Sequence, residues 1–114
     1  MKEALLNLVP IGRFSQLTGL SVRALRLYDA EGLLQPNTVD AETGYRYYDL
    51  KQIPTAERIR SLREVDMPLD DIRVVLHESK KAKASMEKHR GRLIERATAF
   101  KTMIDRLDKI MHDA

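Results

Sequence analysis

The chain has 114 residues, of which 43% are hydrophobic, and a formal charge of +3 from 20 Lys or Arg against 17 Asp or Glu. This length gives one small domain with a thin core, which contacts from a partner subunit would strengthen. The sequence has no cysteine, which excludes disulfides, thiolate metal sites and thiol redox sensing. No apolar run approaches the roughly 20 residues that span a bilayer, so we expect a soluble, cytoplasmic protein.

The positive charge is concentrated in the C-terminal part of the chain. Residues 1–78 hold ten basic and twelve acidic residues, whereas residues 79–114 hold ten basic and five acidic ones. A long basic helix is more often a solvated face than a DNA contact. The net charge alone therefore does not identify a nucleic-acid partner.

Residues 11–31 have the pattern of two short helices joined by a tight turn. Phe14 and Leu17 give the first helix an apolar side. Gly19 suits the positive φ that closes a helix, and Ser21 is placed to cap the next one. This pattern is typical of a helix-turn-helix.

The second of these helices separates apolar from basic positions. Leu25 and Tyr28 lie on one side of it. Arg23 and Arg26 fall between these apolar positions and project away from the core, on a surface that suits a groove of DNA. The alternatives for Arg26 are a solvated side chain and an ion pair with Asp29.

Residues 33–48 predict a small β-hairpin wing. They contain a helix-stopping proline, and the sequence Asp-Ala-Glu-Thr-Gly at 40–44 is typical of a turn. The tyrosine-rich run at 45–48 has a high β propensity. Alternate residues of a strand share a face, so Arg46 and Tyr47 lie on opposite faces. The alternation does not show which face meets DNA.

Two further helices are predicted after the wing. Asp49 and Gln52 resemble a capping pair, and the apolar residues within 53–62 recur at helical spacing. Pro54 lacks a backbone donor, so we expect a 3₁₀ first turn or a helix that begins near this proline. A Met-Pro step at 67–68 then precedes a short helix that has two aspartates in its first turn.

From about residue 82 to the end we expect one long helix, because this region has no proline and a single glycine. Its apolar residues follow one another at steps of four and three, and this heptad stripe consists of Leu93, Ala97, Phe100, Ile104, Leu107 and Met111. The stripe extends about 27 Å at 1.5 Å per residue, beyond the reach of the preceding domain. A second copy of the helix is the expected cover, and a missing domain of a longer chain is the alternative.

Short motifs follow one another without a gap over residues 11–78. They are Ile11-Gly12, Thr18-Gly19-Leu20-Ser21, Leu25-Arg26-Leu27-Tyr28-Asp29, Gly32-Leu33-Leu34-Gln35-Pro36, Gly44-Tyr45-Arg46-Tyr47-Tyr48, Leu62-Arg63, Pro68-Leu69 and Ile72. As an ordered set they resemble the MerR family of transcription regulators. Val39-Asp40 with the run from Thr43 to Tyr48 is most similar to the multidrug-responsive branch of that family.

The resemblance implies a mainly α fold with three parts. These are an N-terminal arm (residues 1–10), a winged helix-turn-helix domain with a small β-hairpin wing (residues 11–78), and a long dimerisation helix (residues 79–114) that forms an antiparallel coiled coil. Two departures stand out: Leu27 replaces a second aromatic residue, and Asp66-Met67 replaces the usual glycine-containing turn.

The resemblance also implies a function. The expected partners are a second copy of the chain, a palindromic operator in double-stranded promoter DNA, and RNA polymerase. Family members distort the promoter spacer when an effector binds, which relies on DNA deformation as well as base contacts. Their ligand-sensing segments follow the coiled coil, so we expect the effector to be sensed outside this segment, whether the chain is a fragment or a short member. The sequence identifies neither the effector nor the operator, and does not distinguish an activator from a repressor.

The residues expected to contact DNA carry hydroxyl or guanidinium groups; they are Ser21, Arg23, Arg26, Tyr28, Arg46, Tyr47 and Arg63. Other roles remain open for several of them. Ser21 serves equally as a helix cap, and Tyr28 as a core residue whose hydroxyl reaches a phosphate. A salt bridge to Glu57 or Glu64 explains Arg63 as well, and Tyr48 is expected in the core. The heptad stripe is the expected dimer interface.

A catalytic role is not supported. The three histidines, at 77, 89 and 112, have spacings that fit neither a metal pair nor a catalytic triad. Asp70 and Asp71 are adjacent on a helix and point in different directions, which is poor geometry for paired acid and base work. We expect no enzyme, metal or cofactor; the alternative to a DNA-binding regulator is a protein-interaction module.

Overall fold

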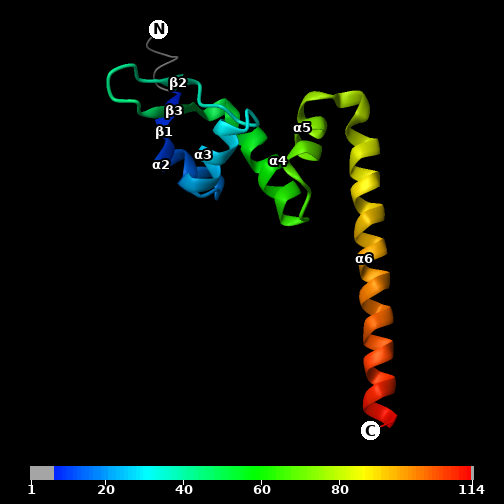
Figure 1. The fold of residues 1–114 in the computed structure, drawn as a ribbon. Coiled ribbons are helices and arrows are strands. Elements are labelled where there is room, and N and C mark those ends of the chain that lie inside the picture. Colours follow the sequence, from blue (N-terminus) through cyan, green and yellow to red (C-terminus); the bar gives the residue numbers. More distant parts are fainter. Residues whose placement is uncertain (1–6, 114) are drawn as a thin grey trace. The chain divides into compact units, whose positions relative to one another are not determined.

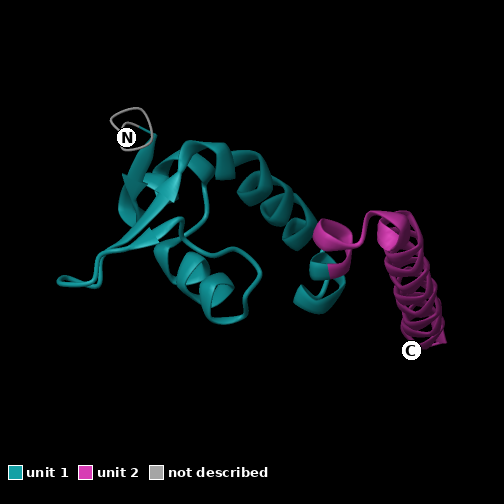
Figure 2. Cartoon of the chain, turned by 90° about the horizontal axis from the view of Figure 1, so that it is seen from above, with its two compact units in different colours: residues 1–73 teal, residues 74–114 magenta. Residues whose placement is uncertain are grey.

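The structure, a computed structural model, describes residues 7–113 (Figure 1). They form two compact units that divide between Arg73 and Val74 (Figure 2). The first unit contains β1 (Leu8–Pro10), α2 (Ile11–Thr18), α3 (Val22–Ala30), β2 (Thr38–Val39), β3 (Arg46–Asp49), η1 (Leu50–Gln52) and α4 (Ile53–Glu64). Helix α5 (Leu69–His77) crosses the division, and α6 (Ser79–Asp113) forms most of the second unit. The predicted mainly α, winged helix-turn-helix fold is confirmed.

The turn between α2 and α3 has the predicted chemistry. Gly19 adopts a φ of 75° at the end of α2, and its N–H donates to the carbonyl of Ser15 at 2.9 Å. Ser21 caps α3, because its Oγ accepts a hydrogen bond from the N–H of Ala24 at 3.0 Å. Both ends of the turn are therefore specified by local residues.

Helix α2 buries a different pair of residues from the one expected. Phe14 and Thr18 face the core, whereas Leu17 is 37% exposed. The hydroxyl of Thr18 tolerates burial because it donates to the carbonyl of Phe14 at 2.8 Å and accepts from the N–H of Leu20 at 3.3 Å. A satisfied polar side chain thus occupies a core position that apolar periodicity does not reveal.

The wing belongs to a three-stranded antiparallel sheet in the order β1-β3-β2. In the central strand, Tyr48 pairs with Val9 of β1 and Arg46 pairs with Val39 of β2. The hairpin was predicted, but β1 was not, because three residues are too few for an alternating pattern to show. It lies within the expected N-terminal arm, whose residues 1–6 are outside the described residues.

Hydrogen bonds from the backbone to Asp40 shape the wing turn at 40–44. Its Oδ1 accepts from the N–H groups of Glu42 at 2.8 Å and Thr43 at 3.1 Å. These bonds lower the pKa of the Asp40 carboxyl below its ordinary 3.8, because they favour the charged form. Gly44 supplies the positive φ, 73°, that returns the chain to β3.

The entry to α4 matches the expected 3₁₀ turn. Asp49 and Gln52 form a reciprocal capping box around η1, and Pro54 then lies in the first turn of α4, where a missing N–H does no harm. The largest side chains that are almost fully buried are Phe14, Thr18, Leu25, Tyr48, Ile59, Met67 and Ile72, all in the first unit.

The turn after α4 adopts its geometry without a glycine. Asp66 has a φ of 62°. Its N–H donates to the carbonyl of Arg63 at 2.9 Å, and the N–H of Met67 donates to the carbonyl of Leu62 at 3.1 Å. This pair of bonds closes a helix with a left-handed residue, and the following Met67 is 1% exposed. Replacement of the expected glycine by Asp66 therefore preserves the turn.

Helix α6 spans 35 residues and begins at Ser79, slightly before the expected start near residue 82. Ala82 and His89 are buried near its N-terminal end. The helix is amphipathic and strongly charged, and none of the described helices is apolar enough over sufficient length to span a bilayer.

Candidate nucleic-acid interface

Helix α3 presents two arginines on the side away from the core. Leu25 and Tyr28 are 0% and 5% exposed, whereas Arg23 and Arg26 are both exposed. Neither arginine makes an ion pair or a hydrogen bond with another residue of the described range 7–113. Their guanidinium donors are therefore available to an external acceptor.

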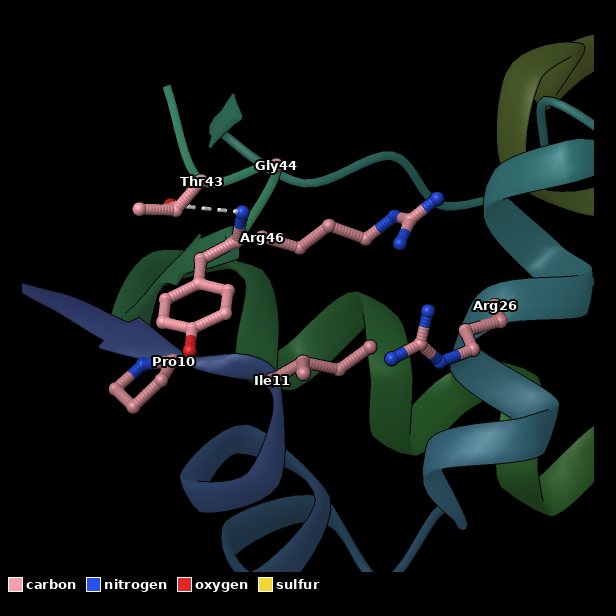
Figure 3. Close-up of a pocket in the computed structure, with 7 residues that line it drawn as sticks. Pro10, Ile11, Arg26, Thr43, Gly44 and Arg46 are labelled. Carbon is pink, nitrogen blue, oxygen red and sulfur yellow. Dashed lines mark hydrogen bonds between the residues drawn. The ribbon is translucent and has the colours of Figure 1, made fainter. Parts of the chain in front are cut away.

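A pocket of about 450 Å³ lies between α3, the wing and the start of α2. Arg26 reaches it from α3 and Arg46 reaches it from β3, and Figure 3 shows the Arg46 side chain extended above Arg26, toward which the Ile11 side chain points. The wing turn closes another side, where the N–H of Tyr45 donates to Oγ1 of Thr43 at 3.2 Å. The pocket lining contains two cations and no acidic residue.

An ion pair joins the wing to α3. The Nε of Arg46 donates to Oδ2 of Asp29 at 2.9 Å, and the two side chains are 31% and 20% exposed. Asp29 thus pairs with Arg46, and not with Arg26 as one sequence interpretation allowed. The pair also shows that the Arg46 face of β3 is directed toward α3.

Tyr48 lies on the same strand face as Arg46 and is completely buried, as expected for a core residue. Its hydroxyl has no hydrogen-bond partner. Burial raises the pKa of Tyr48 above 10, and the nearby Asp29 carboxylate raises it further, against smaller opposite effects of Arg46 and Arg26. The Tyr48 phenol therefore lies close enough to the Asp29–Arg46 pair and to Arg26 for their charges to affect its pKa.

The other expected DNA contacts occupy more varied positions. Ser21 is exposed and serves as the cap of α3. Tyr28 lies in the core, and Tyr47 is partly buried on the strand face opposite Arg46, where it lines a separate pocket of about 280 Å³. Arg63 donates from Nη1 to the carbonyl of Met67 at 2.7 Å, so it stabilises the turn after α4.

The heptad stripe of α6 is largely solvent-exposed in the single chain. Phe100, Ile104 and Leu107 are 55–56% exposed, Met111 is 67% exposed, and Ala97 is exposed too. Leu93 is half-buried. Such a row of large apolar side chains is unfavourable in water unless another surface covers it.

Two apolar residues widen the stripe beyond the predicted set. Met103 and Ile110 are 61% and 65% exposed, and each follows a stripe residue by three positions. The signal was present in the sequence, because residues three apart are neighbours on a helix surface. The apolar face of α6 is therefore broader than a minimal two-helix stripe.

The histidines do not assemble a metal site in the described part of the chain, where no group of three or more potential ligands comes together. His89 is 5% exposed, and its Nδ1 lies 3.4 Å from Nη2 of Arg92. His77 and His112 are exposed. These positions give no support to metal or catalytic chemistry.

Comparison with known proteins places this geometry among regulators. A family model described as "MerR HTH family regulatory protein" matches residues 9–79. The HTH-type transcriptional regulator SkgA of Caulobacter vibrioides is 34% identical over 109 residues, a match that covers 95% of this chain and 42% of SkgA. The chain thus spans about two fifths of the length of this curated relative.

Solved structures share the fold. The N-terminal part of the Bacillus subtilis multidrug transporter activator, MtaN, is similar with a TM-score of 0.77 and 25% identity, over 90% of this chain and 97% of that one. The EcmrR subunit of an EcmrR–DNA complex is similar in fold with a TM-score of 0.84 and 23% identity, over 91% of this chain and 38% of that one. Both similarities include most of the residues that form α6.

Proposed function

Since this chain belongs to the MerR family of helix-turn-helix regulatory proteins, we propose that it binds double-stranded promoter DNA as a homodimer and controls transcription there. The family is one of regulators and not of enzymes. In this proposal the dimer occupies a palindromic operator, distorts the spacer between promoter elements and acts with RNA polymerase. It works in the cytoplasm and responds to an effector sensed outside residues 1–114.

The observation that carries the proposal is the pair of basic elements on one side of the first unit. Arg23 and Arg26 project from α3 with no partner in the described residues, and Arg46 reaches the same pocket as Arg26. Basic side chains on a recognition helix and an adjacent wing match the two surfaces with which a winged helix contacts a groove and its flanking phosphates.

Helix α6 supports the dimeric part of the proposal. Its exposed apolar face needs a cover, and an antiparallel second copy supplies a matching stripe over its whole length. Dimers of helix-turn-helix proteins bind two half-sites, which explains a palindromic operator.

The remaining expected contacts enter the proposal with different weights. Tyr47 and Ser21 have exposed or partly exposed hydroxyl-bearing side chains and are proposed as phosphate contacts. Tyr28 is proposed to contribute only its hydroxyl, because its ring is in the core. Arg63 is proposed as a weaker contact, because the turn after α4 already uses one of its donors.

A salt titration tests the proposal against the alternative of a protein-interaction module. Binding to a fluorescein-labelled duplex of mixed sequence is measured by anisotropy at several NaCl concentrations. Affinity should fall steeply and linearly on a log–log plot, because neutralised phosphates release counterions. Absence of binding at low salt, or binding that is independent of salt, favours the interaction module.

The variant Arg46→Ala sharpens the test. It should weaken binding to every duplex by a similar factor and reduce the salt slope by about 1 per contacting subunit, because a phosphate carries no sequence information. The control Arg58→Ala removes the same charge from an exposed position on α4. A variant that changes sequence preference at constant overall affinity would show that Arg46 reads bases.

A further inference from the structure

We propose that Asp29 is a positioning residue, which holds Arg46 through its Nε so that the terminal guanidinium nitrogens of Arg46 converge with Arg26 on a single phosphate. The proposal rests on the proposed DNA-binding function. It assigns a role in anion binding to a residue that is itself negatively charged, on the side of the domain that faces DNA.

The ion pair engages only one nitrogen of the Arg46 guanidinium. Asp29 accepts from Nε alone, at 2.9 Å, and no second bond joins it to the terminal nitrogens of Arg46. An arginine carries five N–H donors in a rigid, planar fork. Engagement of Nε fixes the plane of the guanidinium and leaves the two terminal nitrogens to bind another acceptor.

The pocket around Arg46 is basic. Arg46 lines the pocket of about 450 Å³ together with Arg26, and no acidic residue lines it (Figure 3). The two guanidinium groups bring positive charge to one pocket, which favours the binding of an anion there. A phosphodiester oxygen pair matches the donor geometry of a guanidinium, which identifies the ligand class.

The ion pair of Asp29 with Arg46 is partly shielded from water. Arg46 and Asp29 are 31% and 20% exposed, so the pair is better ordered than one at a fully exposed site. An unrestrained arginine loses rotamer freedom when it binds a phosphate, which weakens binding by a factor of about three to ten. Asp29 removes this cost because Arg46 is already ordered in the free protein.

The decisive variant is Asp29→Ala, because two explanations predict opposite signs. If Asp29 acts only through its charge, its removal makes the surface more positive and tightens binding. If Asp29 positions Arg46, its removal weakens binding about three- to ten-fold per contacting subunit, despite the gain in net charge. Anisotropy titration of the labelled duplex at fixed salt gives the sign directly.

Three matched variants separate positioning from general effects. Glu31→Ala removes the same charge two residues along and should bind as tightly as wild type or more tightly, because the Glu31 side chain makes no hydrogen bond or ion pair within residues 7–113. Asp29→Asn keeps an acceptor for Nε and should restore most of the affinity. Arg46→Lys keeps the charge but has no fork, so it should weaken binding much as Asp29→Ala does.

The same titration in an Arg46→Ala background completes the experiment. Asp29→Ala should cause no further loss there, because the group that Asp29 positions has been removed. Any of three results would overturn the proposal. The Asp29→Ala protein binds as tightly as wild type, its loss of affinity persists in the Arg46→Ala background, or the Arg46→Lys protein has wild-type affinity. Circular dichroism tests whether each variant is folded. If Asp29→Ala is not folded, the affinities of Asp29→Asn and Arg46→Lys decide whether the proposal holds. Failure of the wild-type protein to bind duplex would instead reject the proposed function itself.

Discussion

Phe14 and Tyr48 stack with their ring centroids 4.4 Å apart and their planes within 9° of parallel. The contact joins the first helix of the helix-turn-helix to the central strand of the wing. Both rings are 0% exposed, so the helix-turn-helix and the wing share one core. The position of Arg46, two residues before Tyr48, depends on this core.

Replacement of Tyr48 by Phe should leave the stability at neutral pH unchanged or raise it by about 1 kcal/mol, because the buried hydroxyl has no partner to lose. The stack and the volume of the ring are retained. Urea unfolding followed by circular dichroism measures the change. The control is Tyr45→Phe, which should leave the stability unchanged because Tyr45 is 64% exposed.

The pH dependence of the same pair of proteins gives a second readout. The pKa of Tyr48 is raised in the folded state, so the folded protein favours the neutral phenol. This contribution to stability is complete below the unfolded pKa of about 10 and is lost as pH rises through the higher folded pKa. Tyr48→Phe should lose less stability than wild type above pH 10, and a large loss of stability at pH 7 would contradict the absence of a hydroxyl partner.

Gly19→Ala should destabilise the first unit by about 1 kcal/mol, because a Cβ is strained at a φ of 75°. A Cβ at this position would also lie 2.7 Å from Nη1 of Arg60, which contacts the carbonyl of Thr18. The control is Gly12→Ala in the same helix, where a Cβ meets nothing within 4 Å. It should be neutral or stabilising in urea unfolding, and equal effects of the two variants would exclude a special role of the turn.

The left-handed residue after α4 is tested by two substitutions of Asp66. Both Asp66→Gly and Asp66→Ala remove the carboxylate, so the difference between them isolates the cost of a Cβ at a φ of 62°. The glycine variant should be more stable than the alanine variant by about 1 kcal/mol. Alanine equal to glycine in urea unfolding would mean that the turn relaxes to another conformation.

The sequence predicted those features of the fold that neighbouring residues specify. Gly19 and Ser21 close and open helices through bonds that span three or four residues, and the capping box of Asp49 and Gln52 is equally local. Such requirements leave a signature in residue type at fixed spacing. The end of α2, the start of α3 and the entry to α4 followed from them.

Features that depend on distant residues could not be predicted in the same way. Asp29 and Arg46 are 17 residues apart, and only the packing of the wing against α3 brings them together. The burial of Thr18 and the pairing of β1 likewise follow from tertiary contacts that override local pattern. The candidate site was therefore predicted as a set of basic and hydroxyl-bearing residues, but the ion pair of Asp29 with Arg46 was not predicted.

The last prediction concerns the coupling between α6 and DNA. Phe100→Asp with Ile104→Asp places two charges in the middle of the exposed stripe and should convert a dimer into monomers, measured by light scattering. The control protein carries Thr98→Asp with Thr102→Asp, which adds the same charge on the opposite side of the helix. It should remain dimeric. Wild-type monomers at micromolar concentration would exclude the stripe as a dimer interface.

Loss of the dimer should weaken DNA binding, although none of the substituted residues belongs to the proposed DNA interface. A rigid dimer raises the effective concentration of the second half-site once the first has bound. If Arg23 contacts one phosphate and Arg26 and Arg46 share a second, each subunit neutralises two phosphates, and the slope of log affinity against log salt changes from about −4 in the dimer to about −2 in the monomer. The measurement compares wild type, the stripe variant and the control on one palindromic duplex, after circular dichroism shows that the first unit remains folded. Because the control carries the same added charge, a change confined to the stripe variant assigns the effect to dimerisation. Equal slopes and affinities for all three proteins would mean that each subunit binds DNA independently, which would rule out the dimeric operator complex.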